Sequence, residues 1–195
     1  MDTFNEQIVQ KKKTAGEYAI IVAAVLGVLV LAVLMLFIPL LMILVAAAGF
    51  GAYYLITAQN KEFEYSVTNG DIDIDTIIGR RKRKRIVSVT GKKVERLLPF
   101  EEGRFRGVDY QRVVMAAPSM HEPELWYFTY HSKKNGHTAV VFQPDNRVLS
   151  ALYSGLQTTV RLETDRALRE KLDGVQRREK FRIRWYNDDL SFLTL

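Results

Sequence analysis

Six consecutive basic residues, Arg80–Arg85, form the most concentrated charge in the sequence. Basic runs of this kind hold phosphate groups, either on anionic lipid headgroups or on nucleic acid. Alternate residues of a strand face opposite sides, so Arg81, Arg83 and Arg85 would share one face. We therefore take these three arginines as candidate contacts for anionic lipid. No aromatic residue is interleaved with the run, and this disfavours binding of single-stranded nucleic acid.

A second interpretation makes the same run structural. If the chain reverses at Ile78-Gly79, Lys82 lies opposite Asp75. Lys84 then lies opposite Asp73. Cross-strand pairs of opposite charge stabilise a sheet by about 0.2–1 kcal/mol each. The sequence leaves both interpretations open.

Three alternating carboxylates, Asp71, Asp73 and Asp75, resemble the start of a calcium-binding loop. Such a loop needs Gly at its sixth position and Glu at its twelfth. Thr76 and Lys82 occupy those positions here. The segment is better explained as a strand, and we expect no metal site.

The remaining chemistry-bearing residues also argue against an enzyme. His131 and His137 flank an Asn-Gly turn and could be neighbours across it, but no carboxylate accompanies them in sequence. The chain has no Cys, which excludes thiol catalysis and Cys-ligated zinc. It also lacks a Gly-rich phosphate loop, a Gly-X-Ser-X-Gly elbow and a His-Glu-X-X-His helix. We expect no enzymatic activity and no cofactor.

The segment most informative about location runs from Tyr18 to Asn60, 43 residues without a charged side chain or His. A bilayer-spanning helix needs about 20 apolar residues, so this segment is long enough for two. Pro39 lies near its middle and cannot continue a helix. We predict a transmembrane helical hairpin over 17–60, with helices at about 17–38 and 40–58. A single kinked helix would exceed the bilayer thickness, and a signal peptide has an apolar region of only about 7–15 residues.

Charge predicts the orientation of this hairpin. Lys11–Lys13 precede the first helix, and Lys61 and the basic run follow the second. Because positive flanks stay in the cytoplasm, we expect a multi-pass protein of the plasma membrane with both termini cytoplasmic, including a tail at 1–16. The spans carry no ionisable side chain, which argues against a transporter. Small residues in the second helix would allow close packing on the first helix or on another copy: Ala46–Ala48, Gly49, Gly51 and Ala52.

Residues 61–160 have the pattern of an antiparallel β domain. Asn69-Gly70 separates two alternating runs and predicts a tight hairpin that pairs Val67 with Ile72 and Tyr65 with Ile74. Five further strands are expected near 82–90, 93–98, 110–117, 124–131 and 137–143. Asp145 can then cap an amphipathic helix, whose apolar residues are Val148, Leu149, Leu152, Tyr153 and Leu156.

This order of two apolar spans, seven strands and a capping helix resembles a family of uncharacterised small bacterial membrane proteins with a cytoplasmic PH-like domain. The hairpin segment 65–75 and the basic run after it carry the resemblance. It implies an α+β membrane protein, in which the hairpin precedes a seven-stranded antiparallel β-barrel or sandwich capped by a C-terminal helix. It implies no substrate.

Residues 161–195 form a C-terminal extension beyond the expected capping helix. Thr164 or Asp165 could begin a second helix there. Phe181–Tyr186 alternates apolar and basic residues, and we expect it to join a sheet edge. The alternative is an interfacial segment lying on lipid.

These features favour a membrane-anchored, non-enzymatic interaction or regulatory protein that presents a basic PH-like domain at the cytoplasmic face. Its partners would be the bilayer and a protein or further copies of itself, and not nucleic acid. The alternative function is an anionic-lipid-sensing module that uses Arg81, Arg83 and Arg85. An enzyme with an unrecognised site is the third interpretation.

Overall fold

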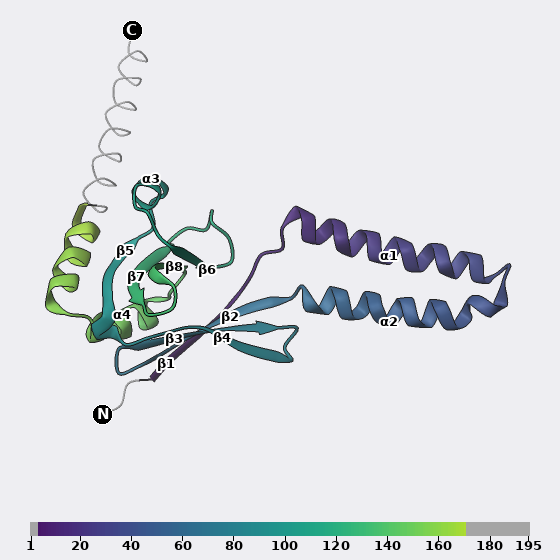
Figure 1. The fold of residues 1–195 in the computed structure, drawn as a ribbon, viewed down its shortest axis with the longest axis horizontal. Coiled ribbons are helices and arrows are strands. Elements are labelled where there is room, and N and C mark those ends of the chain that lie inside the picture. Colours follow the sequence, from purple (N-terminus) through teal and green to yellow (C-terminus); the bar gives the residue numbers. More distant parts are fainter. Residues whose placement is uncertain (1–3, 171–195) are drawn as a thin grey trace, which may run out of the picture.

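The computed structural model describes residues 4–170. Two long apolar helices project together from a β domain (Figure 1). They are α1 (Ala15–Met35) and α2 (Met42–Ala58), and the short 3-10 helix η1 (Pro39–Leu41) leads into α2. Thr14 begins α1 with a capping box, in which its hydroxyl accepts from the Glu17 N–H and the Glu17 carboxylate accepts from the Thr14 N–H at 2.8 Å. Pro39 starts η1, where its missing N–H leaves no helical hydrogen bond unmade. The prediction of two N-terminal apolar helices is confirmed.

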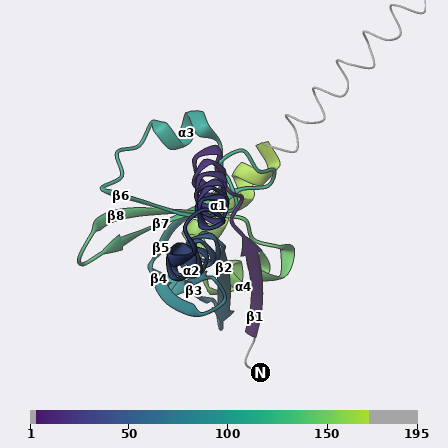
Figure 2. The same cartoon turned by 90° about the vertical axis from the view of Figure 1, so that its right-hand side faces the viewer.

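The first sheet begins with a strand that the sequence did not predict. β1 (Phe4–Gln10) pairs antiparallel with β2 (Lys61–Thr68), from Phe4 opposite Thr68 to Gln10 opposite Glu62. We expected a tail here because the segment is mostly polar, and of its residues Val9 alone is buried. The helix pair is therefore inserted between two neighbouring strands. In Figure 2, β1 lies at one side of its sheet, with the N-terminus at its free end.

The same sheet continues in the order β1-β2-β3-β4, with β3 at Asp71–Ile78 and β4 at Lys82–Val89. Asn69 and Gly70 join β2 to β3 with φ of 52° and 85°, the left-handed values that a two-residue hairpin turn requires. Val67 lies opposite Ile72, and Tyr65 lies opposite Ile74. The predicted hairpin and its register are confirmed.

A second sheet packs on the first and has the order β5-β7-β8-β6. Its strands are β5 (Val94–Pro99), β6 (Arg112–Ala116), β7 (Trp126–Ser132) and β8 (Gly136–Phe142), with η2 (Gly91–Lys93) before β5 and α3 (Glu102–Arg106) before β6. The strand β6 runs parallel to β8. The expectation of a seven-stranded antiparallel β-barrel or sandwich needs correction in strand number and direction, because residues 4–170 contain two packed four-stranded sheets and one parallel pair of strands. Two causes account for the difference: β1 adds a strand to the first sheet, and the loop before β6 places that strand at the far edge of β8.

The core lies between the two sheets and is closed by α4 (Asn146–Gly155). The Asp145 side chain caps α4 by accepting from the Val148 N–H at 2.8 Å, as predicted. The ring of Phe142 meets those of Tyr65 and Phe128 edge-on, with centroids 5.7 and 5.3 Å away. The Tyr65 hydroxyl donates to the Ala116 carbonyl, and burial raises the pKa of this side chain.

A further helix covers residues 158–170. It begins six residues before Thr164, the predicted cap. Thr164 therefore lies within the helix, where its side chain is buried and its hydroxyl donates to the Leu97 carbonyl at 2.8 Å. Residues 161–170 are thus part of the domain, because this contact and the burial of Ala167 hold the helix against β5 and its neighbours. The prediction for Phe181–Tyr186 lies outside the described residues.

Three glycines meet where the β2–β3 turn touches the end of α4. A Cβ on Gly155 would lie 2.5 Å from the Gly70 Cα, and a Cβ on Gly91 would collide with the Gly70 carbonyl oxygen. Backbone atoms cannot yield as a flexible side chain can, so this contact requires glycine. It fixes α4 over the first sheet.

We expect Gly155→Ala to lower the free energy of unfolding by about 1–3 kcal/mol, because the added methyl overpacks a backbone contact. The matched control is Gly103→Ala, where a Cβ would meet no atom within 4 Å. Unfolding of the full-length variants in nonionic detergent measures the difference. Equal stability of the two variants would contradict the close approach at Gly155.

Candidate anion-binding site

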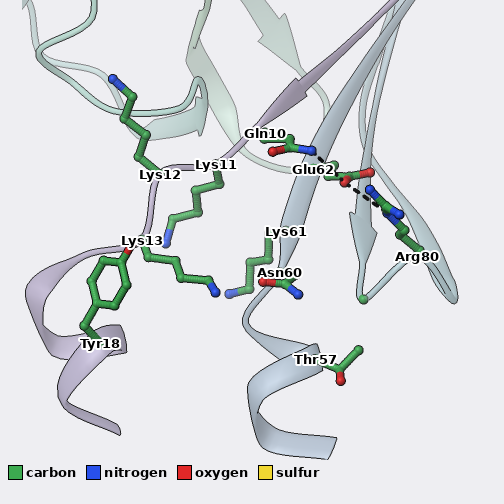
Figure 3. A pocket seen from close by; sticks show the side chains of 11 residues that line it. Gln10, Lys11, Lys12, Lys13, Tyr18, Thr57, Asn60, Lys61, Glu62 and Arg80 are labelled. Atoms are coloured by element: carbon green, nitrogen blue, oxygen red, sulfur yellow. Dashed lines mark hydrogen bonds and ion pairs between the residues drawn. The ribbon is translucent and has the colours of Figure 1, made fainter. Parts of the chain in front are cut away.

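A cleft of about 800 Å³ lies where the helices meet the first sheet. Its walls are residues 10–13 with Tyr18, residues 60–62 with Thr57, and Gly79-Arg80 (Figure 3). These segments come from the start of α1, the end of α2 and the β3–β4 turn. The cleft therefore combines parts of the chain that are far apart in sequence.

Strand pairing brings the first two walls together. The last pair of β1 and β2 is Gln10 opposite Glu62, and the Lys11 N–H then donates to the Lys61 carbonyl at 2.9 Å. Beyond this hydrogen bond the two segments diverge into α1 and α2. Lys11–Lys13 and Lys61 are thereby held beside one another, although 47 residues separate Lys13 from Lys61.

The β3–β4 turn forms the third wall and is attached to the end of α2. The Gly79 N–H donates to the Asn60 carbonyl at 2.7 Å. Gly79 has a φ of 59°, and a Cβ there would lie 2.9 Å from the Thr57 carbonyl oxygen, so glycine permits this approach. Arg81 extends the attachment, because its guanidinium donates to the Tyr53 hydroxyl at 2.9 Å and lies 5.6 Å from the centre of that ring.

The cleft has a large excess of positive charge. Five of its side chains are cationic, and Glu62 is its one carboxylate. Glu62 lies 3.6 Å from the Arg80 guanidinium. Two of the lysines have carboxylate partners in ion pairs: Lys11 with Glu17 at 2.7 Å and Lys12 with Glu122 at 2.6 Å.

Lys13 and Lys61 differ from these, because neither has an ion-pair partner within residues 4–170. Both side chains are partly buried. Figure 3 shows them pointing toward one another from opposite walls of the cleft. An anion between these two ammonium groups would be stabilised by both.

The three arginines singled out in the sequence lie outside the walls of this cleft. Arg83 pairs with Glu64 and, at 2.7 Å, with Asp75. Arg85 lies 3.0 Å from both Asp73 and Asp75. The hydrogen bond that Arg85 donates to Asp75, with the charges of Asp73 and Asp75, raises the pKa of Arg85. Lipid contact by the three arginines stays a prediction.

The ion pairs on β4 form a ladder, but with residues other than those expected. Lys84 lies opposite Thr76 and Lys82 opposite Ile78, because the turn between β3 and β4 holds three residues. Glu64 and Asp75 are 4% and 5% exposed, so the arginines that partner them neutralise buried charge. The ladder is thus structurally necessary on the face that carries Arg83 and Arg85.

The other predicted features of the sequence appear as follows. His131 and His137 are cross-strand neighbours, as the Asn-Gly turn suggested. Asp71, Asp73 and Asp75 lie on β3, and within residues 4–170 no group of three His, Cys, Asp or Glu side chains is arranged to hold a metal ion. The cleft was not predicted from the sequence, because Lys11, Lys13 and Lys61 were interpreted only as signals of membrane orientation. The hairpin itself was the available clue, since its two basic flanks must emerge together.

Comparison with known families shows that this chain matches one of them. The family described as "Bacterial PH-like domain (DUF6106)" matches residues 1–162. The chain belongs to this family. The match includes β1, both apolar helices and α4, so the helix insertion lies within the span that the PH-like family shares. No curated protein and no solved structure shows a significant match.

We expect Arg83→Ala to destabilise the PH-like domain by about 1–3 kcal/mol, because it leaves buried Glu64 without an ion-pair partner within residues 4–170 and leaves Asp75 with Arg85 alone. Arg83 is itself half exposed, which keeps the loss below that of a fully buried pair. Lys84→Ala is the control: it removes the adjacent charge, which has no ion pair within residues 4–170. Denaturant unfolding in detergent compares the two, and equal losses would contradict a structural role for the ladder.

Proposed function

We propose that this PH-like protein is a non-enzymatic interaction or regulatory protein anchored in the plasma membrane. In this proposal α1 and α2 form a transmembrane hairpin, and the β domain lies at the cytoplasmic face. The partners are the bilayer and a protein or a further copy of the chain. Anionic-lipid sensing is the second function, and the basic cleft supports it.

The dimensions and surface of the helices support the membrane anchor. The segments Ala15–Met35 and Pro39–Ala58 have 21 and 20 residues and are apolar enough to cross a bilayer. At about 1.5 Å per residue each is about 30 Å long, close to the thickness of the hydrocarbon core. Every residue of both helices is at least partly exposed, and large apolar side chains such as Val30 and Phe50 are 59% and 72% exposed. In water this surface would be strongly unfavourable, whereas lipid would solvate it.

One observation supports the proposed hairpin most directly: β1 and β2 stay paired almost as far as the start of α1 and the end of α2. The hydrogen bond from the Lys11 N–H to the Lys61 carbonyl fixes both entry points at one place. A chain that crossed the membrane once would put these residues on opposite sides and would have to separate β1 from β2. Basic residues flank both helices at this junction, and such residues favour the cytoplasmic side of the membrane.

The proposed interaction role is supported by the free edge of β1. This strand ends the first sheet, and Phe4 and Ile8 on its outer face are 61% and 55% exposed. Edge strands offer unpaired N–H and C=O groups to a partner strand. The attachment of the β3–β4 turn to α2 would hold this edge at a constant angle to the bilayer.

Because the chain has no Cys, single cysteines can test the topology directly. We expect a membrane-impermeant maleimide to label Phe37→Cys, in the turn between the helices, from outside intact bacterial cells. Glu6→Cys and Lys134→Cys, in β1 and the β7–β8 turn, should be labelled only in inverted vesicles. Labelling of Glu6→Cys and Lys134→Cys from opposite sides would exclude the hairpin. Recovery of the protein in the soluble fraction would exclude the anchor.

A further inference from the structure

We infer that the basic cleft binds the phosphate of one anionic phospholipid headgroup, held between Lys13 and Lys61. This inference rests on the proposed membrane anchor, because the ligand reaches the cleft from the bilayer. Such binding differs from the general attraction of a basic protein to an anionic membrane. A specific site binds one lipid molecule and retains it when the bulk membrane is removed.

The first support is the arrangement of charge. Lys13 and Lys61 converge from different walls, and neither meets a carboxylate within residues 4–170 (Figure 3). Like charges repel, so an anion between them would lower the electrostatic energy of their convergence. Glu62, the one carboxylate of the cleft, already lies beside Arg80 and cannot neutralise the lysines alone.

The second support is the rigidity of the cleft. The Lys11 N–H to Lys61 carbonyl bond fixes the first two walls, and the Gly79 N–H to Asn60 carbonyl bond fixes the third. Lys11 is held by Glu17 and is thereby positioned beside the gap. The backbone that carries both lysines is therefore in place before the ligand binds, and only the two side chains lose freedom on binding.

The position of the cleft favours a lipid over a free phosphate ion. It opens where α1 begins and α2 ends, which is the depth of the headgroup layer when these helices span the bilayer. Its volume of about 800 Å³ exceeds what a phosphate ion fills and lies in the range of small-molecule sites, about 300–1,000 Å³. Apolar side chains continue beyond it along both helices, such as Val22 and Leu55, and these would contact the acyl chains.

Charge also selects among phospholipids. A phosphatidylglycerol headgroup brings a negative charge to the lysines without a compensating cation. Phosphatidylcholine carries the same phosphate with a quaternary ammonium group, which the five cations of the cleft would repel. The expected ligand is therefore an anionic phospholipid with an uncharged or acidic headgroup.

The test is native mass spectrometry of the full-length protein in nonionic detergent, titrated with phosphatidylglycerol or with phosphatidylcholine of the same acyl chains. We expect one phosphatidylglycerol to be retained, with an affinity at least tenfold higher than that for phosphatidylcholine. The double variant Lys13→Ala/Lys61→Ala should lose this preference. The control variant Lys133→Ala/Lys134→Ala removes the same charge from the β7–β8 turn, outside the cleft, and should keep it.

Three outcomes would overturn the inference. They are equal retention of the two lipids by the wild-type protein, an unchanged preference in Lys13→Ala/Lys61→Ala, and retention of inorganic phosphate in place of the lipid. The comparison of the two lipids with the wild-type protein tests the inference even when a variant does not fold. A protein that needs detergent but shows no lipid preference refutes this inference alone. A protein that purifies without detergent refutes the membrane anchor as well.

Discussion

The antiparallel pairing of β1 with β2 is the constraint on which the rest of the structure depends. It closes a loop of 50 residues between Gln10 and Lys61, and nearly all of that loop is the apolar helix pair. Closing a long loop has an entropic cost that local contacts do not repay. Here the ladder of seven residue pairs, with the contact between α1 and α2, stabilises the closure. The helices and the β domain consequently form one unit, with the basic cleft at their junction.

The second constraint is electrostatic. Glu64 and Asp75 are nearly buried on the face of the first sheet opposite to the core, and Arg83 lies between them. Buried carboxylates are tolerated only with partners of opposite charge, so part of the basic run is committed to the fold. Two basic groups without such partners within residues 4–170, Lys13 and Lys61, converge at the cleft. A dense run of charge in a sequence can thus be partly structural, while two lysines from separate segments form the proposed lipid site.

Local signals in the sequence were sufficient for much of the fold. Asn69-Gly70 predicted a turn and the register of its hairpin. Asp145 predicted a helix cap, and Pro39 predicted the division between the two apolar helices. Each of these residues acts through its own backbone geometry or hydrogen bonds, so a local pattern is sufficient to recognise it. The strands β4 to β8 also lie where alternation and turn residues indicated.

Features that depend on distant contacts were not predictable. β1 has too few apolar residues to be recognised without its partner, and the parallel pairing of β6 depends on how a loop crosses the domain. The three-residue turn after Ile78 shifted the ladder from Lys82 and Lys84 to Arg83 and Arg85. The cleft was missed for the same reason, since it exists only where three separate segments meet.

The pairing of β1 with β2 around the helices is most directly tested by a disulfide. Glu6 lies opposite Ser66, and strand partners lie about 4.5–5.5 Å apart between Cα atoms, within reach of a disulfide. In the naturally cysteine-free full-length protein, Glu6→Cys/Ser66→Cys should form an intramolecular disulfide when isolated native membranes are treated with a thiol oxidant such as copper phenanthroline. Glu6→Cys/Asp73→Cys, with its second cysteine one strand further away at about 10 Å, should not. Equal crosslinking of both pairs, or free thiols in the first, would contradict the insertion of the helices between β1 and β2.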